Sequence, residues 1–219
     1  MRINITLWLI VINVIIFIFQ VIAAGSNFDL IKTPGCTPND IGWGPGCDGL
    51  SDLLALNTKI LIEGGYIWQI FTYMFTHGGF AHIFLNMFAL LMFGHRVELE
   101  MGPRKFLTFY ILCGIGSALL FMTITGISNS PMLGASGAIF GVLTAFGIMF
   151  PRATVFVMGY IPMPAIFAVI LFGGIELFFG VTGFEPGIAN FGHLGGMITG
   201  FILLKFFGFQ RRKVRFYWE

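Results

Sequence analysis

Residues 105–126, KFLTFYILCGIGSALLFMTITG, decide the fold class of this chain. After Lys105 the stretch carries no charged residue, and apolar side chains fill most of its length. A helix needs about 20 predominantly apolar residues to cross the hydrocarbon core of a bilayer, and this stretch is long enough. It therefore predicts a transmembrane helix, and the rest of the chain repeats its pattern.

Five further stretches are similar, so the sequence predicts an all-α polytopic membrane protein with a bundle of six transmembrane helices. The predicted spans are residues 5–24, 80–96, 105–126, 136–150, 163–181 and 190–208. The composition agrees, because 57% of the 219 residues are hydrophobic and only 10% are charged. A soluble domain could not bury that much apolar surface, and a disordered chain would lack it. We expect one membrane domain over residues 1–219.

The first apolar stretch has a second interpretation. Arg2, the apolar run and the small residues Ala23 and Ala24 are also typical of a cleaved signal peptide. The run over residues 5–24 is longer than the roughly 7–15 residues usual for the apolar region of such a peptide. A retained first helix is therefore favoured.

The lysines and arginines predict how the helices are oriented. If the N-terminus is cytoplasmic, only Lys32 and Lys59 of the 12 basic residues lie outside. The cytoplasmic set is then Arg2, Arg96, Arg104, Lys105, Arg152, Lys205, Arg211, Arg212, Lys213 and Arg215. Because cytoplasmic loops carry an excess of basic residues, both termini are expected in the cytoplasm. The net charge of +2 is too small to indicate nucleic-acid binding.

One long connection, residues 25–79, follows the first predicted helix and is expected on the outer side. Residues 50–61 place apolar side chains at helical spacing, which predicts one short amphipathic helix. Residues 64–68, GGYIW, indicate a turn followed by an aromatic segment at the membrane interface. Cys36 and Cys47 of this loop either form a disulfide or stay unpaired. Cys113, within a span, is expected to be a packing residue.

Three polar clusters lie in or beside the predicted spans, where polar groups are costly and often functional. His77, His82 and Asn86 flank the start of the second span, Ser136 opens the fourth and His193 lies in the sixth. His82 and Asn86 are four residues apart and share a helix face. Alternating helix directions bring the three clusters toward the same side of the membrane. The alternative is structural: a helix cap at Ser136 and ordinary hydrogen bonds between helices elsewhere.

These side chains suit nucleophilic catalysis. A serine hydroxyl needs an adjacent base, and His193 is the candidate for Ser136. Glycines after both residues would let the fourth and sixth helices approach closely. His82, Asn86 and the Ser136 N–H are candidate donors to an oxyanion. No acidic residue is close to His193 in the sequence, so a Ser–His dyad is expected rather than a triad.

Together these residues resemble the rhomboid family of intramembrane serine proteases, in its six-helix bacterial and archaeal form. Residues 134–137, GASG, are similar to the family's Gly-x-Ser-Gly motif. Residues 193–200, HLGGMITG, are similar to its His-x-x-Gly-x-x-x-Gly motif, and residues 77–86 reproduce its His-x4-His-x3-Asn spacing. A series at intervals of four resembles the pattern across the second and third helices: Gly94, Glu98, Gly102, Phe106, Tyr110 and Gly114.

The resemblance implies a serine endopeptidase in which Ser136 attacks the scissile carbonyl and His193 acts as general base, then acid. It implies that His82 and Asn86 assist the oxyanion, and that His77 supports the loop or holds water. The implied substrates are single-pass transmembrane proteins, cut near the outer face of a cell membrane after entry past the fifth helix. The implied partners are these substrates and membrane lipid, with no metal or nucleotide cofactor. The oligomeric state stays open.

Two positions depart from the family pattern. Gln69 follows Trp68 where many members have arginine, which argues against a structural hydrogen-bonding role for this position. Phe140 replaces a tyrosine four residues after the nucleophile, which keeps stacking on the base but loses any hydroxyl contact.

Two acidic residues lie in or near the spans. Glu98 is expected to tie cytoplasmic helix ends together through Arg96 or Arg104. Glu176, near the outer end of the fifth helix, is expected to reach water or to take part in the gate.

Two other functions compete with the protease. A related protein that binds membrane clients without cutting them would lack the serine or the base, and both are present here. A small transporter would line a path through the bilayer centre with charged residues or broken helices in symmetric halves. The polar residues here gather toward one face instead, which favours hydrolysis.

Overall fold

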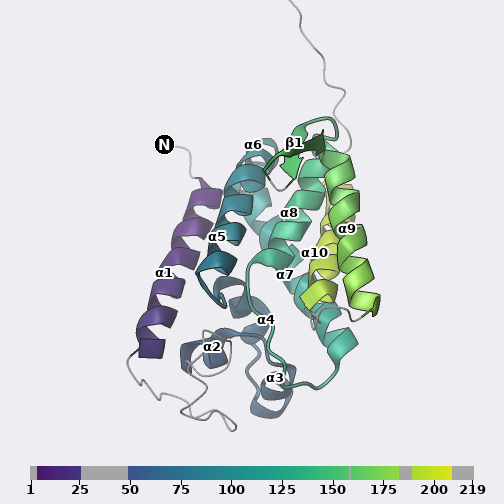
Figure 1. Cartoon of the computed structure of the whole chain (residues 1–219). Coiled ribbons are helices and arrows are strands. Elements are labelled where there is room, and N and C mark those ends of the chain that lie inside the picture. The colour runs from purple at the N-terminus through teal and green to yellow at the C-terminus, as the bar shows by residue number, and fades with distance from the viewer. Residues whose placement is uncertain (1–3, 26–48, 158, 183–188, 209–219) are drawn as a thin grey trace, which may run out of the picture.

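The computed structural model describes residues 4–25, 49–157, 159–182 and 189–208, and Figure 1 shows their arrangement as a bundle of helices. The long helices are α1 (Ile5–Gly25), α7 (Pro103–Thr125), α8 (Ser136–Met149), α9 (Ala165–Thr182) and α10 (Ala189–Phe206). A sixth helical segment consists of α5 (Phe80–Ala89), a π-helical turn η2 (Leu90–Gly94) and α6 (His95–Met101). The predicted all-α polytopic architecture is confirmed.

Four of the described helical segments are long and apolar enough to cross a membrane: Ile5–Ala23, Phe80–Met101, Pro103–Thr125 and Ala165–Thr182. The second runs five residues beyond the predicted end at position 96. Helix α8 is apolar but has only 14 residues. Helix α10 is less apolar, because it contains Asn190, His193 and Lys205. That all six cross the membrane therefore stays a prediction.

Helix α8 lies at the centre of the bundle. Figure 1 shows α1 at one edge and α9 at the other, and α8 packs against α7, α9 and α10. Every residue of α8 from Gly137 to Gly147 except Phe140 is buried. The glycines of α8 and α10 bring the two backbones into contact: a Cβ atom on Gly196 would overlap the carbonyl oxygen of Gly137, and one on Gly200 would lie 2.8 Å from that of Gly141. The predicted close approach is confirmed.

The single helix predicted over residues 50–61 is wrong. Two short helices occur there, α2 (Gly49–Leu54) and α3 (Thr58–Gly64). The break is at Leu56, whose backbone pairs with Met132 just before α8, and at Asn57, whose side chain accepts from the N–H groups of Lys59 and Ile60. Asparagine is a favoured helix cap, so it starts a new helix where periodicity alone predicts continuation. The predicted turn is confirmed by Gly65, which ends α3 with φ +73°.

Gln69 holds the next part of the loop together, contrary to expectation. It begins α4 (Gln69–Thr72), which is followed by the 3-10 turn η1 (Tyr73–Phe75). Its fully buried side chain accepts from the Asn57 N–H over 3.1 Å and donates to the carbonyl oxygen of Asp52 over 3.0 Å. A neutral amide can both donate and accept, so it satisfies backbone groups on both sides of the break.

A β-hairpin, which the sequence analysis did not predict, connects α8 to α9. Strand β1 (Thr154–Val157) pairs antiparallel with β2 (Ile161–Pro164), and Gly159 between them has φ +82°. Val155 and Val157 are buried. Helix α9 begins two residues after the approximate predicted start at position 163, because a proline at 164 disfavours helical geometry in the residue before it.

Glu98 is structural, but its predicted partners are wrong. Its carboxylate accepts from the N–H groups of Ile5 and Thr6, at 2.7 and 2.9 Å, and from the Thr6 hydroxyl at 2.7 Å. It therefore caps the start of α1, where the helix dipole favours negative charge. The guanidinium of Arg96 lies instead over the Phe150 ring.

Of the three cysteines, Cys113 is buried in the bundle, as predicted. Cys36 and Cys47 lie outside the described residues.

Candidate active site

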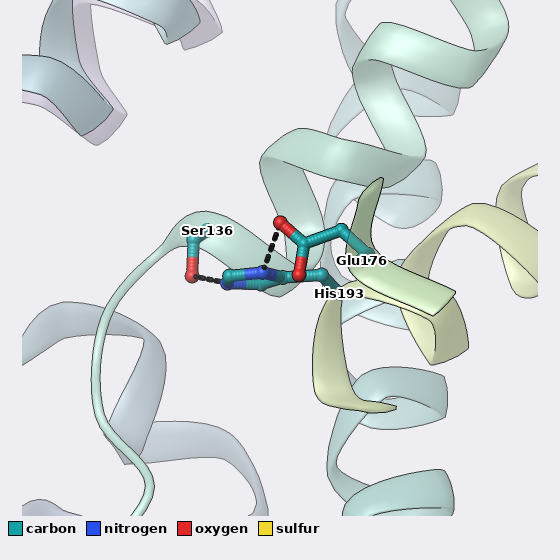
Figure 2. Close-up of polar contacts among 3 residues, drawn as sticks. All are labelled: Ser136, Glu176 and His193. Carbon is teal, nitrogen blue, oxygen red and sulfur yellow. Dashed lines mark hydrogen bonds and ion pairs between the residues drawn. The ribbon is translucent and has the colours of Figure 1, made fainter. Parts of the chain in front are cut away.

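Ser136 and His193 meet at the interface of α8 and α10. Ser136 is the first residue of α8, and its Oγ lies 2.7 Å from Nε2 of His193, as Figure 2 shows. The glycine contact between the helices explains this proximity. Gly137 directly follows the serine, and Gly196 lies about one turn after the histidine, so the same backbone contact brings both side chains together.

The turn before α8 requires a glycine. Gly134 has φ +109°, and its N–H donates to the carbonyl oxygen of Tyr73 over 3.0 Å. A Cβ atom there would lie 2.7 Å from Nε2 of His82 and 3.8 Å from Oγ of Ser136. His82 and Ser136 therefore face the same small space, which glycine leaves open.

The hydrogen bonds of His82 assign its proton. The Gly78 N–H donates to Nδ1 of His82 over 3.4 Å, so Nδ1 carries a lone pair. A neutral imidazole then has its proton on Nε2, the nitrogen that faces Gly134 and Ser136. His82 is thus able to donate toward the nucleophile.

Asn86 and His77 surround this centre in different ways. The buried Asn86 amide donates to the carbonyl oxygen of His82 over 2.9 Å, so its described bond is within α5. Nε2 of His77 accepts a long hydrogen bond, 3.5 Å, from the Ala135 N–H beside the nucleophile. Burial, with a smaller contribution from His82, lowers the pKa of His77 to about 3. His77 is therefore a neutral acceptor that contacts the turn before α8.

Phe140 stacks on the imidazole of His193, with ring centroids 4.4 Å apart and an interplanar angle of 14°. The stacking expected from the sequence is present. It covers one face of the ring and restricts its rotation.

A third group at this centre was not predicted from the sequence. Oε1 of Glu176, on α9, lies 3.0 Å from Nδ1 of His193. The expectation that His193 has no acidic neighbour is therefore wrong, and Glu176 contacts the base as well as being partly exposed. The available signal was topological: position 176 lies close before the end of α9 and position 193 close after the start of α10, so a helical hairpin puts them at similar depth.

The chain is similar in sequence to known proteins over most of its length. A profile of the Rhomboid domain matches residues 64–210. Over 160 residues the chain is 31% identical to RHOMBOID-like protein 6, mitochondrial, of Arabidopsis thaliana, covering 73% of this chain and 50% of that protein. It is 35% identical over 159 residues to rhomboid protease GluP of Bacillus subtilis, covering 71% and 29%.

A further relative carries a different description. Inactive RHOMBOID-like protein 8 of Arabidopsis thaliana is 30% identical over 156 residues, covering 71% of this chain and 42% of that protein. The chain spans half or less of the length of each of these three relatives.

Proposed function

The chain belongs to the rhomboid family, and from this we propose that it is an intramembrane serine endopeptidase that cuts transmembrane segments of membrane proteins. One observation carries the proposal: the 2.7 Å contact between Oγ of Ser136 and Nε2 of His193. A nucleophile within hydrogen-bond reach of a base is the arrangement that activates a serine. The relative named as a protease, from Bacillus subtilis, supports the same reaction.

The reaction starts with Ser136 and His193. Oγ bonds to the scissile carbonyl carbon while its proton moves to Nε2 of His193 and the carbonyl electrons move to oxygen. Collapse of this intermediate breaks the C–N bond, and the imidazolium gives its proton to the leaving amine. A water molecule, deprotonated by the same nitrogen, then releases the acyl group from the serine.

The oxyanion is stabilised from two directions. The backbone N–H of Ser136 is at the N-terminus of α8, where helix N–H groups are free to donate and the dipole favours negative charge. Nε2 of His82 faces the same space from α5. Asn86 supports His82 through its bond to the His82 backbone, and His77 supports the turn that presents the serine.

The substrates that suit this site are single-pass transmembrane proteins, which reach it laterally from the lipid past α9. We place the site near the outer face of a cell membrane, with both chain termini in the cytoplasm. This orientation rests on the distribution of lysine and arginine.

The test is cleavage of a single-pass transmembrane reporter by the purified protein, with Ser136→Ala and His193→Ala as variants. We expect loss of product in both variants while helical content and elution in detergent are unchanged. A fluorophosphonate should label the wild type but not Ser136→Ala. Cleavage that survives Ser136→Ala would mean that another group is the nucleophile.

A wild type that cleaves no reporter and takes up no fluorophosphonate would favour the alternative of a client-binding protein without protease activity. One relative of this chain is named as inactive, which is the observation that keeps this alternative open.

A further inference from the structure

Glu176 places a carboxylate where the expected dyad has none. Helix α9 carries it, and Oε1 lies 3.0 Å from Nδ1 of His193, on the side of the ring opposite the serine. Both side chains are largely withdrawn from solvent, with exposed fractions of 15% for Glu176 and 19% for His193. A charge in such a place is costly unless another group compensates it, so its contact with the histidine requires an explanation.

Nδ1 of His193 has no aligned hydrogen-bond partner among the described residues. The Glu176 carboxylate lies 3.0 Å from Nδ1, within hydrogen-bond distance, but off the direction of an ideal N–H bond. Hydrogen bonds in catalytic centres are often poorly aligned without substrate and tighten in the complex.

The second carboxylate oxygen is held as well. Asn190 contacts two groups of α9. With its amide nitrogen facing Glu176, it donates to Oε2 of Glu176 over 3.3 Å, and its amide oxygen accepts from the Gly180 N–H over 3.3 Å. In the reverse orientation the amide oxygen would face an acceptor and the amide nitrogen would face a donor. Asn190 is buried and lies less than one turn before His193, so α10 orients both the base and its carboxylate partner.

We propose that Glu176 is a positioning residue that completes a Ser136–His193–Glu176 triad; this inference rests on the proposed function. Its carboxylate accepts from Nδ1–H and so selects the imidazole tautomer in which Nε2 has a free lone pair. That lone pair takes the Ser136 proton when Oγ bonds to the carbonyl carbon. The imidazolium then formed lies between Ser136 and a negative charge, and the charge of Glu176 stabilises it until the proton passes to the leaving amine.

Three substitutions separate charge from hydrogen bonding. Glu176→Gln keeps an oxygen that can accept from Nδ1–H but removes the charge, Glu176→Ala removes both, and Glu176→Asp keeps the charge on a shorter side chain. Leu177→Ala is the matched control, because it truncates the next residue of α9, which is 52% exposed.

The first readout is the rate at which a fluorophosphonate labels Ser136, because this reagent does not need to dock as a transmembrane helix. We expect Glu176→Gln and Glu176→Ala to label about 10- to 100-fold more slowly than wild type. Glu176→Asp should recover part of that loss, and Leu177→Ala should match wild type. In reporter cleavage, kcat should fall while KM stays within about 2-fold. A Gln variant with the wild-type labelling rate, or a loss confined to KM, would overturn the inference and indicate that Glu176 only holds α9 in place.

The second readout is the ¹⁵N spectrum of the His193 ring, which requires no activity. We expect Nδ1–H in wild type and in Glu176→Gln, and a mixture of tautomers in Glu176→Ala. Persistence of a single Nδ1–H tautomer in the Ala variant would contradict the inference. A wild type that neither labels nor cleaves would instead overturn the proposed function, and with it the role of Glu176 in catalysis.

Discussion

At the scale of single residues, some side chains of the site were predicted from sequence motifs and others were not. Ser136, His193 and the stacking of Phe140 were predicted because each residue lies in or beside a recognisable motif, although the contacts join α8 and α10. The contact of Glu176 was missed because no sequence motif marks this residue, and the contact depends on how α9 is rotated against α10. Gln69 was misjudged for a related reason: its partners lie across a break between helices that periodicity did not reveal.

Gly134→Ala should damage the site more than the fold. The substitution strains a backbone with φ +109°, which costs about 1–2 kcal/mol, and it also places Cβ against His82. Gly126→Ala is the control, because φ is +60° there but no atom lies within 4 Å of the new Cβ. Thermal unfolding in detergent should fall for both variants, whereas fluorophosphonate labelling should fall only for Gly134→Ala. Equal labelling in the two variants would mean that the space between His82 and Ser136 does not matter.

His77 should make the fold sensitive to acid. Because burial lowers its pKa to about 3, the unfolded chain binds a proton at this residue below about pH 6.5 while the folded chain does not. The free energy of unfolding should therefore decrease as pH falls from about 6.5 toward 3. The variant His77→Gln can still accept from the Ala135 N–H. Its free energy of unfolding should depend less steeply on pH than that of wild type. Parallel curves would contradict the prediction.

At the scale of elements, helices were predicted better than their interruptions. Long apolar runs identify a helix without tertiary information, so the bounds of α8, α9 and α10 agree with prediction within two residues. The hairpin β1–β2 and the break at Asn57 depend on pairing with distant backbone, as between Leu56 and Met132. The periodicity of apolar residues does not predict pairing with a distant part of the backbone.

Gly196→Ala tests the contact between α8 and α10. The new Cβ would overlap the carbonyl oxygen of Gly137, and backbone cannot rotate away as a side chain does. We expect a loss of about 1–3 kcal/mol in stability and about 100-fold in labelling of Ser136, because the helices separate. Gly174→Ala on α9 meets no atom within 4 Å, so it should keep wild-type activity and gain slightly in stability. Wild-type labelling in Gly196→Ala would show that the helices need not touch.

Glu98→Ala should loosen the start of α1. It removes the acceptor of three hydrogen bonds from Ile5 and Thr6, so we expect a loss of about 1–2 kcal/mol in detergent unfolding. Glu63→Ala, an exposed acid on α3, is the control and should be neutral. If both variants melt alike, the cap does not contribute to stability.

At the scale of the whole molecule, the orientation in the membrane is the prediction with the widest consequences. Single cysteines at Ile62 and Arg152, in a chain without its natural cysteines, should react differently with an impermeant maleimide. Position 62 should react in intact cells, and position 152, beside the hairpin, only after permeabilisation. Both are exposed in the structure, so the reverse result would invert the topology and move the proposed cleavage to the cytoplasmic side.

The backbone contact between α8 and α10 limits how this molecule can move. Where side chains separate two helices, rotamer changes let the helices slide or tilt, but here carbonyl oxygens of Gly137 and Gly141 meet Gly196 and Gly200 directly. We therefore expect the two helices to move together, carrying both the nucleophile and its base. Motion that admits a substrate is then expected at other helices, with the reacting pair kept assembled during substrate entry and product release.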